Sequence, residues 1–196
     1  LNENYLAKPS STGMPSRPLV DMAILDDDGT PLEQGVIGEV SIRSVCNFLG
    51  YWKDEDATRA AYSDEAYFRT GDLGYLDEDN YLFIVDRKKD IIIRGGENIS
   101  CLEVEEAIYA HPAVAECSVF GLPDERFGEI PAAVYHTHEG RDLTPEDLQE
   151  FLHEHIAAFK VPTIMWRSEE QLPRLGTQKV DKRTVKATFA KEHLAA

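Results

Sequence analysis

Four consecutive residues, Arg69-Thr70-Gly71-Asp72, place a glycine and a carboxylate among apolar residues of strand-forming type. A glycine permits close approach of the backbone to a ligand. An ionised aspartate accepts two hydrogen bonds, which suits the neighbouring hydroxyl groups of a vicinal diol. The same residue types are common in polar hairpins, so R-T-G-D on its own leaves both interpretations open.

A pair of glycines, Gly95 and Gly96, lies in the segment IIIRGGENIS, which we predict to follow a strand and to open a helix. Paired glycines there could let the backbone approach a ligand while the helix N-terminus faces negative charge. A plain strand-to-helix turn would also use glycine. The segment fits neither the Walker pattern nor G-x-G-x-x-G, so by itself it is a weak phosphate-loop signal.

A third candidate is Lys179, which ends the turn-forming segment PRLGTQK just before the predicted last helix. A lysine in a loop could neutralise a carboxylate or phosphate oxygen as a compact point charge. The alternative is an ordinary solvated lysine.

Histidine, glutamate and cysteine form weaker patterns. His136 and His138 could face one side of a strand, but two imidazoles without a third ligand predict no metal site. A solvated helix face is predicted for Glu103, Glu105 and Glu106. The widely spaced cysteines are predicted to be reduced structural thiols; they are Cys46, Cys101 and Cys117.

The composition is acidic, with 36 Asp and Glu against 20 Lys and Arg and a net charge of -16. Such a surface repels nucleic acid and anionic lipid, so an anionic ligand would need a local basic pocket. No apolar run approaches the roughly 20 residues of a membrane-spanning helix, and the start lacks the features of a signal peptide. We therefore expect no membrane span and a cytoplasmic location.

The elements around these residues predict an α+β fold in two parts. In the first part, strands are predicted over residues 20–25, 38–43, 67–76 and 81–85, with a short helix over 54–62. Five consecutive charged residues, 86–90, then mark a domain boundary after residue 86. The first part is thus a small β-rich subdomain.

The second part alternates strands and helices, as expected for a small sheet flanked by helices. Strands are predicted over residues 91–93, 113–120, 130–136 and 163–167, and helices over 102–110, 148–158 and from 182 onwards. Ser100 with Glu103 is a capping-box pattern, and Thr144 with Pro145 predicts another helix start.

In order and spacing, these motifs resemble the adenylate-forming superfamily, which includes acyl-CoA synthetases, peptide-synthetase adenylation domains and luciferases. The segments GVIGEVSIR, GYW and DEDATRAAY resemble the surroundings of the family's R-T-G-D motif. The resemblance covers nearly the whole chain. It implies that residues 1–86 are the last subdomain of the adenylating N-terminal domain, and that residues 87–196 are the C-terminal mobile lid domain.

The resemblance assigns nucleotide and hinge residues. Asp72 would hold the ribose hydroxyls of ATP and of the acyl-adenylate. The run DRKKD resembles the hinge G-R-x-K-D, with Asp86 in place of the usual glycine. Arg87 would be a second ribose contact, and the backbone of Lys89 would turn to swing the small domain between two orientations.

The catalytic lysine of the family corresponds to Lys179, because LPRLGTQKVDKR resembles the terminal motif P-R-T-x-x-G-K. Gln178 replaces the glycine of that motif, which costs some backbone freedom but leaves the lysine in register.

The segment IIIRGGENIS resembles the loop that lines the pantetheine tunnel, which places Gly95 and Gly96 beside CoA. Peptide-synthetase domains more often show G-[FY]-R-I-E there, so GGENI favours a CoA ligase. Phe127 in DERFGE resembles a CoA-side contact, and Phe159 in AFKVPT resembles an aromatic residue that stacks on the CoA adenine.

The CoA phosphates have no obvious partner by this resemblance. Some relatives carry basic residues two and four positions after the aromatic residue, where this chain has Val161 and Thr163. Lys160 is therefore a candidate substitute.

The implied reaction has two steps. A carboxylate attacks the α-phosphate of Mg-ATP to give acyl-adenylate and pyrophosphate, and the CoA thiol then displaces AMP. The family's phosphate loop and Y-G-x-T-E-like segment are not in this sequence, so Mg²⁺ would be bound mainly by the absent N-terminal region. We expect a fragment that is inactive alone and needs that missing domain, with a carboxylic acid, ATP and CoA as substrates.

Two other functions remain open. The chain could belong to an adenylation module that loads a carrier protein and ignores free CoA. It could also be a stand-alone binding protein built from the lid domain.

Overall fold

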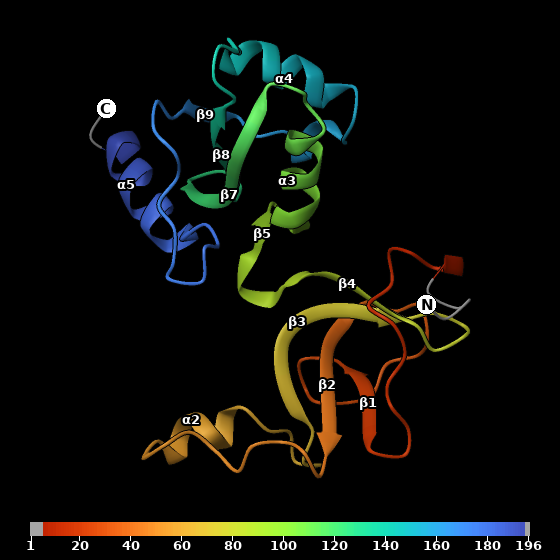
Figure 1. The fold of residues 1–196 in the computed structure, drawn as a ribbon. Coiled ribbons are helices and arrows are strands. Elements are labelled where there is room, and N and C mark those ends of the chain that lie inside the picture. The colour runs from red at the N-terminus through yellow and green to blue at the C-terminus, as the bar shows by residue number, and fades with distance from the viewer. Residues whose placement is uncertain (1–5, 195–196) are drawn as a thin grey trace. The chain divides into compact units, whose positions relative to one another are not determined.

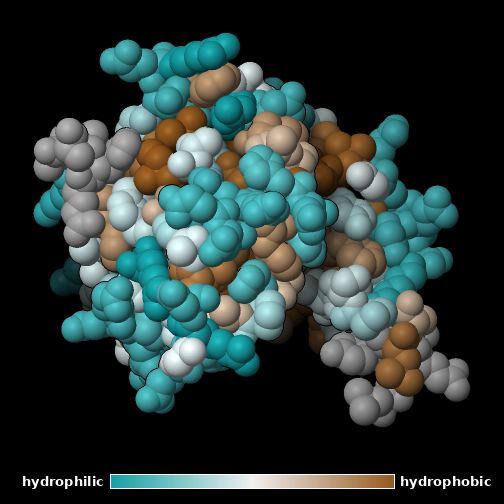
Figure 2. Space-filling view, turned by 90° about the horizontal axis from the view of Figure 1, so that it is seen from above, coloured by the Kyte–Doolittle hydropathy of each residue, from teal (hydrophilic) through white to brown (hydrophobic). Residues whose placement is uncertain are grey.

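The computed structural model describes residues 6–194, the last three by their backbone alone. The chain divides into two compact units, Leu1–Lys89 and Asp90–Ala196 (Figure 1). The described residues form two sheets and four α-helices, so the predicted α+β class is confirmed. None of these helices is long and apolar enough to cross a membrane. Hydrophilic residues predominate on the face shown in Figure 2.

The first unit is built on a four-stranded antiparallel sheet in the order β1-β2-β3-β4. The strands are β1 (Val20–Leu25), β2 (Gly38–Ser44), β3 (Phe68–Leu76) and β4 (Leu82–Arg87). The short helix α2 (Glu55–Ala60) lies in the connection from β2 to β3, and its N-cap Asp54 accepts a hydrogen bond from the backbone of Ala57. Ile24, Val40 and Leu82 form the buried core.

The R-T-G-D motif lies inside β3, not in a turn. Ser41 pairs with Arg69, and the register with β2 shifts between Glu39 and Ser41. The alternative interpretation of the motif as a polar hairpin is therefore wrong. A bulged strand keeps the motif in the sheet while it lets the backbone bend.

The five charged residues 86–90 do not form one linker. Strand β4 continues through Arg87, which pairs with Asp72 in the register of the sheet. The 3₁₀ turn η1 (Lys88–Asp90) follows. The two units consequently divide between residues 89 and 90, whereas the charge pattern placed the boundary after residue 86.

The second unit contains a five-stranded sheet in the order β6-β5-β8-β7, with β9 beside β8. The strands are β5 (Ile91–Arg94), β6 (Glu97–Ser100), β7 (Val114–Asp124), β8 (Gly128–Thr137) and β9 (Ile164–Arg167). All pairs are antiparallel except β8 with β9. The helices are α3 (Cys101–Tyr109), α4 (Pro145–His153) and α5 (Lys182–Leu194), with the 3₁₀ turn η2 (Ala158–Lys160).

Helices cover both faces of this sheet. Val119 packs in one core with residues of α3 and α4, whereas its neighbour Phe120 packs in a second core with Val185 of α5. Successive side chains of a strand point to opposite faces, so the apolar run of β7 serves both cores. Figure 1 shows α5 on one side of β7 and β8 and α3 on the other.

Both predicted helix caps are confirmed. The hydroxyl of Ser100 accepts a hydrogen bond from the backbone of Glu103, and that of Thr144 accepts one from Asp147, with Pro145 at the first helical turn. The helix predicted over residues 148–158 was placed too late at both ends. It begins at Pro145 and ends at His153.

The predicted helix start at the paired glycines is wrong. Gly95 and Gly96 form the turn of a hairpin between β5 and β6, and α3 begins at Cys101. Both glycines have positive φ, +60° and +92°, a conformation that residues with a side chain rarely adopt.

Candidate functional site

In the first unit, Asp72 and Arg87 lie opposite each other on β3 and β4. The Arg87 Nε lies 3.4 Å from the Asp72 Oδ1, and the side chains are 60% and 35% exposed. The backbone N–H of Asp72 donates to the Thr70 hydroxyl, which in turn donates to the carbonyl of Val40. The carboxylate and the guanidinium are thus held together and open to solvent, as a contact to paired hydroxyls requires.

A buried carboxylate, Glu39, supports this motif from β2. It accepts a hydrogen bond from the backbone of Gly71 at 3.2 Å, and it lies 3.4 Å from the Arg69 Nε and 3.2 Å from the Lys88 Nζ. Lys88 also binds Asp27 at 2.7 Å, and this hydrogen bond raises the pKa of Lys88. Glu39 therefore ties the R-T-G-D strand to the residue before Lys89. Lys89 itself is exposed.

In the second unit, the β5–β6 hairpin meets the turn between β7 and β8. The backbone N–H of Gly95 donates to the carbonyl of Phe127 at 2.7 Å, and Arg94 pairs with Gly128. A Cβ on Gly95 would lie 3.3 Å from the Phe127 ring, and one on Gly96 would meet nothing within 4 Å. The structure therefore places Gly95 beside Phe127, with open space at Gly96.

Two guanidinium groups stack on Phe127. The Cζ of Arg94 lies 4.1 Å from the ring centroid and that of Arg126 lies 4.9 Å from it, both within cation–π range. The Nε of Arg94 is buried and has no hydrogen-bond acceptor among the described residues.

The second predicted CoA segment lies elsewhere in this unit, on η2. Phe159 is 36% exposed. The ammonium of Lys160 binds both carboxylate oxygens of Glu103, at 2.6 and 2.7 Å. The positive charge of Lys160 is thus already matched by a carboxylate, whereas the two arginines at Phe127 have no such match among the described residues.

Lys179 is exposed in a narrow loop between β9 and α5. The loop is closed by backbone hydrogen bonds from Leu175 to the Lys179 carbonyl, from Gln178 to the Leu175 carbonyl and from Asp181 to the Pro173 carbonyl. Gln178 has a φ of +67°, a left-handed conformation in a residue with a side chain. This conformation costs roughly 1–2 kcal/mol.

A buried carboxylate on β7, Glu116, fixes the start of this loop. It accepts the backbone N–H of Leu172 at 2.8 Å and forms an ion pair with Arg174. The guanidinium of Arg174 also donates to the carbonyl of Gln178 at 2.5 Å. Burial opposes the ionisation of Glu116, but the hydrogen bonds from Leu172 and Arg174 outweigh burial and hold its pKa below the ordinary value. Glu116 is thereby linked to the residue before Lys179.

A second carboxylate, Glu105 on α3, fixes the end of the loop. The Lys182 Nζ lies 2.7 Å from the Glu105 Oε1, which also accepts the backbone N–H of Val119. Burial opposes the charge of Lys182, but Glu105 outweighs it and raises the pKa of this lysine. The prediction that Glu105 lies on a solvated helix face is therefore wrong, although Glu103 and Glu106 are exposed.

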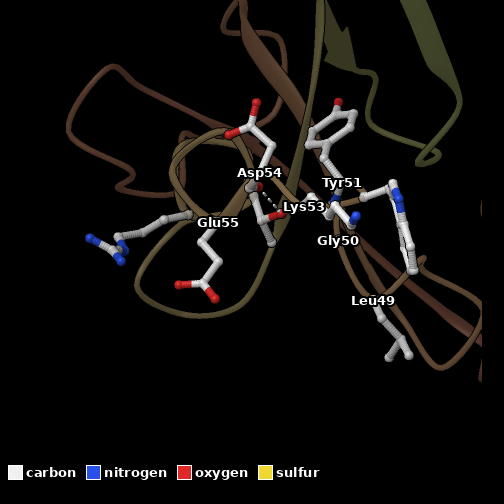
Figure 3. Close-up of a pocket in the computed structure, with 9 residues that line it drawn as sticks. Leu49, Gly50, Tyr51, Lys53, Asp54 and Glu55 are labelled. Atoms are coloured by element: carbon white, nitrogen blue, oxygen red, sulfur yellow. Dashed lines mark hydrogen bonds between the residues drawn. The ribbon is translucent and has the colours of Figure 1, made fainter.

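A surface pocket of the first unit is lined by other residues than the predicted sites. It lies around α2, and its lining includes Gly50, Tyr51 and Glu55, as Figure 3 shows. Leu49 and Trp52 in its lining are among the most exposed apolar side chains. None of the predicted site residues lines this pocket.

The described residues contain no group of three His, Cys, Asp or Glu side chains arranged to hold a metal ion. The Nδ1 of His136 lies 2.9 Å from the carbonyl oxygen of Ser168, in a contact typical of a structural histidine. Cys46 is exposed, contrary to its predicted structural role, whereas Cys101 and Cys117 are buried.

Residues 103–179 match the family described as AMP-binding enzyme C-terminal domain. The chain carries an AMP-binding enzyme C-terminal domain. This domain comprises most of the second unit, from helix α3 to Lys179.

The curated relatives of this chain include CoA ligases. The oxalate–CoA ligase of Saccharomyces cerevisiae is 39% identical over 94% of this chain and 34% of its own length. The long-chain-fatty-acid–CoA ligase FadD13 of Mycobacterium tuberculosis is 38% identical over 97% of the chain and 37% of its own. The chain thus spans about a third of the length of the curated relatives it matches.

Solved structures agree with this assignment. The o-succinylbenzoate CoA synthetase MenE of Bacillus subtilis, in complex with its acyl-adenylate intermediate, matches with a TM-score of 0.85 at 32% identity, over 95% of this chain and 37% of that one. ATP-bound MatB from Rhodopseudomonas palustris matches with a TM-score of 0.84 at 33% identity, over 92% and 36%. The resemblance to the adenylate-forming superfamily is confirmed.

Sequence reasoning missed the side chains that hold the predicted site residues of the second unit in place. One usable signal was Glu116, an acidic residue inside the apolar strand segment VAECSVF, because a buried carboxylate needs a partner. For Glu105 no such local signal existed, because its partner Lys182 lies far along the chain.

Proposed function

We propose that this chain is the carboxyl-terminal part of an ATP-dependent acid–CoA ligase that forms acyl-CoA, AMP and pyrophosphate through an acyl-adenylate. The observation that carries the proposal is the loop of Lys179. Its base is fixed by two buried carboxylates, while Lys179 itself is exposed and has no ion-pair partner among residues 6–191. A cation presented in this way can serve a ligand that comes from outside the chain.

In the first step, an oxygen of the substrate carboxylate attacks the α-phosphorus of ATP, and pyrophosphate leaves. Both reactants are anions, so they repel each other as they approach. Lys179 would bridge the carboxylate and the α-phosphate oxygens and offset this repulsion. Asp72 would accept hydrogen bonds from the ribose hydroxyls, and Arg87 would donate to them.

In the second step, the CoA sulfur attacks the acyl carbon, the bond to AMP breaks, and the thiol proton is released. We propose that rotation about Lys89 withdraws Lys179 and brings the Gly95-Gly96 turn to the active site. Phe127 and Phe159 would contact CoA. Mg²⁺ is expected to accompany ATP, and we assign no residue of this chain to it.

The test is ATP–pyrophosphate exchange over a panel of carboxylic acids. This chain would be compared with a protein extended upstream to the length of its relatives. We expect exchange with at least one acid in the extended protein and none in the chain alone. Exchange in neither protein, or in the short chain alone, would contradict the proposal.

The thiol acceptor is then tested with the acid that supports exchange. The extended protein is supplied with either free CoA or a carrier protein that bears phosphopantetheine. We expect thioester formation on free CoA. Transfer to the carrier protein alone would identify a carrier-loading module instead.

A further inference from the structure

The two arginines on Phe127 form a cationic site with a fixed backbone. Arg94 ends β5, and Arg126 lies in the turn that leads into β8. The backbone N–H groups of Arg126 and Phe127 both donate to the Asp124 Oδ1, at 2.9 and 2.7 Å. The hydrogen bond from Gly95 to the Phe127 carbonyl joins the two turns. The guanidinium groups are therefore brought together by ordered backbone, not by chance contact of long side chains.

Neither guanidinium has a carboxylate within ion-pair distance in the part of the chain that the structure describes. Carboxylates outnumber cations in the chain, with 36 acidic against 20 basic side chains, yet none pairs with these two arginines among the described residues. The nearby carboxylate of Asp124 binds backbone N–H groups. That of Glu129 accepts the backbone N–H of Ile93 at 3.0 Å. Both acids are engaged and leave the arginines for another anion.

The site also offers a buried donor and open space. The Nε of Arg94 is buried without an acceptor, and an unsatisfied donor favours binding of a group that accepts a hydrogen bond. Arg126 is exposed, and so is the adjoining turn of Gly95 and Gly96. A guanidinium fork recognises phosphate oxygens well, because it donates two parallel hydrogen bonds.

We propose that Arg94 and Arg126, stacked on Phe127, bind the phosphate groups of CoA. This inference rests on the proposed function, which makes CoA the polyanionic substrate that this unit meets. It also assigns the phosphate contacts that Val161 and Thr163 cannot make and that Lys160, held by Glu103, is poorly placed to make.

The experiment uses the extended protein and measures thioester formation with CoA, dephospho-CoA and pantetheine. Pantetheine keeps the thiol but lacks all phosphates. In the variant R94Q/R126Q, we expect the KM for CoA to rise by about 10- to 100-fold, as the loss of charge-assisted hydrogen bonds implies. The KM for pantetheine should not change. ATP–pyrophosphate exchange should also stay at the wild-type rate, because it does not involve CoA.

The matched control is Arg183→Gln, which removes an exposed arginine on α5 that has no ion-pair partner in the described part of the chain. It should leave every KM unchanged. An unchanged KM for CoA in R94Q/R126Q would overturn the proposal. So would an equal rise for CoA and pantetheine, because that pattern reports a distorted turn instead of lost phosphate contacts.

Direct binding separates this inference from the proposed reaction. Adenosine 3′,5′-bisphosphate, the nucleotide portion of CoA, is titrated calorimetrically into wild type and variants, with inorganic phosphate as a second titrant. We expect the bisphosphate to bind wild type and Arg183→Gln alike, and R94Q/R126Q about 10-fold or more weakly. Equal binding to all three, or no binding to wild type, would refute the site. Binding without any thioester formation would refute the proposed function alone.

Discussion

The loop of Lys179 and the turn of Gly95-Gly96 are held in opposite ways. Two buried carboxylates anchor the Lys179 loop, because Glu116 pairs with Arg174 before Lys179 and Glu105 pairs with Lys182 after it. The glycine turn is held by backbone hydrogen bonds and by the ring of Phe127, and its arginines have no carboxylate partner in the described part of the chain. Charge is thus used for positioning in one place and kept for a ligand in the other.

This difference suits two steps with different demands. A single lysine that must reach a small reacting centre needs one fixed position. A turn that must accept a long, flexible anion needs exposed donors and room for its backbone.

The largest effect is expected from Lys179→Ala in the extended protein. Adenylate formation should fall by about 10²- to 10³-fold, the usual cost of removing a group that stabilises developing charge. Thioester formation from supplied acyl-adenylate should be spared. Single-turnover assays of each half-reaction measure both effects, with Lys186→Ala on α5 as the control. Equal loss of both half-reactions would show that the two regions do not divide the chemistry.

The proposed rotation, which replaces the Lys179 loop by the Gly95-Gly96 turn at the active site, is tested by Lys89→Pro. Proline fixes φ and removes a backbone donor, so the proposed rotation should be blocked. One half-reaction should then fall by on the order of 10²-fold while the other is retained, because small misplacements at a reacting centre have effects of this size. Lys89→Ala is the control and should behave like wild type, because alanine leaves the backbone free to rotate. Normal activity of Lys89→Pro in both steps would remove the hinge.

Glu116→Gln tests the anchoring carboxylate. The ion pair with Arg174 is partly solvent-exposed, so we expect a loss of about 1–2 kcal/mol in the free energy of unfolding at neutral pH. The pKa of Glu116 is lowered in the folded chain. The carboxylate therefore contributes stability above its ordinary pKa of about 4.3, and this contribution is lost as the pH falls through the lower folded-state pKa.

Urea unfolding of wild type and Glu116→Gln between neutral and acidic pH measures this contribution. The difference between the two proteins should shrink on acidification. A difference that does not depend on pH would mean that Glu116 acts through packing and not through its charge. Glu150→Gln, at an exposed position of α4, is the control.

The smallest effect is expected at Gln178. Glycine tolerates the left-handed conformation that Gln178 adopts, but it loses more entropy on folding, so Gln178→Gly should stabilise the chain by about 0.5–1 kcal/mol. Thermal unfolding measures the gain. Gln171→Gly, at another exposed position of this unit, should give none. Destabilisation by Gln178→Gly would mean that the side chain of Gln178 helps to hold the Lys179 loop.

Local signals in the sequence predicted most of the fold. The caps at Ser100 and Thr144 and the charge run of residues 86–90 involve only a few neighbouring residues, so they could be recognised without a structure. The β5–β6 hairpin was missed because ENIS is a strand of four residues directly followed by a helix. A strand that short gives no period to distinguish it from a helix start.

The site was predicted as isolated residues, without their supports. The contact between Glu105 and Lys182 joins helices far apart in sequence, and that between Glu116 and Arg174 joins a strand to a distant loop. Such pairs follow from tertiary packing, which no helical or strand pattern encodes. For the same reason, Lys160 looked like a free cation until its contact with Glu103 was visible.

The cysteines of the two units differ in their accessibility to solvent. Cys46 is exposed in the first unit, whereas Cys101 and Cys117 are buried in the second, where burial raises the pKa of the Cys117 thiol. A thiol-reactive dye should therefore label the folded chain at one position. Labelling at the other two would report the opening of the second unit, so a mass spectrum taken during denaturation can follow the second unit by itself.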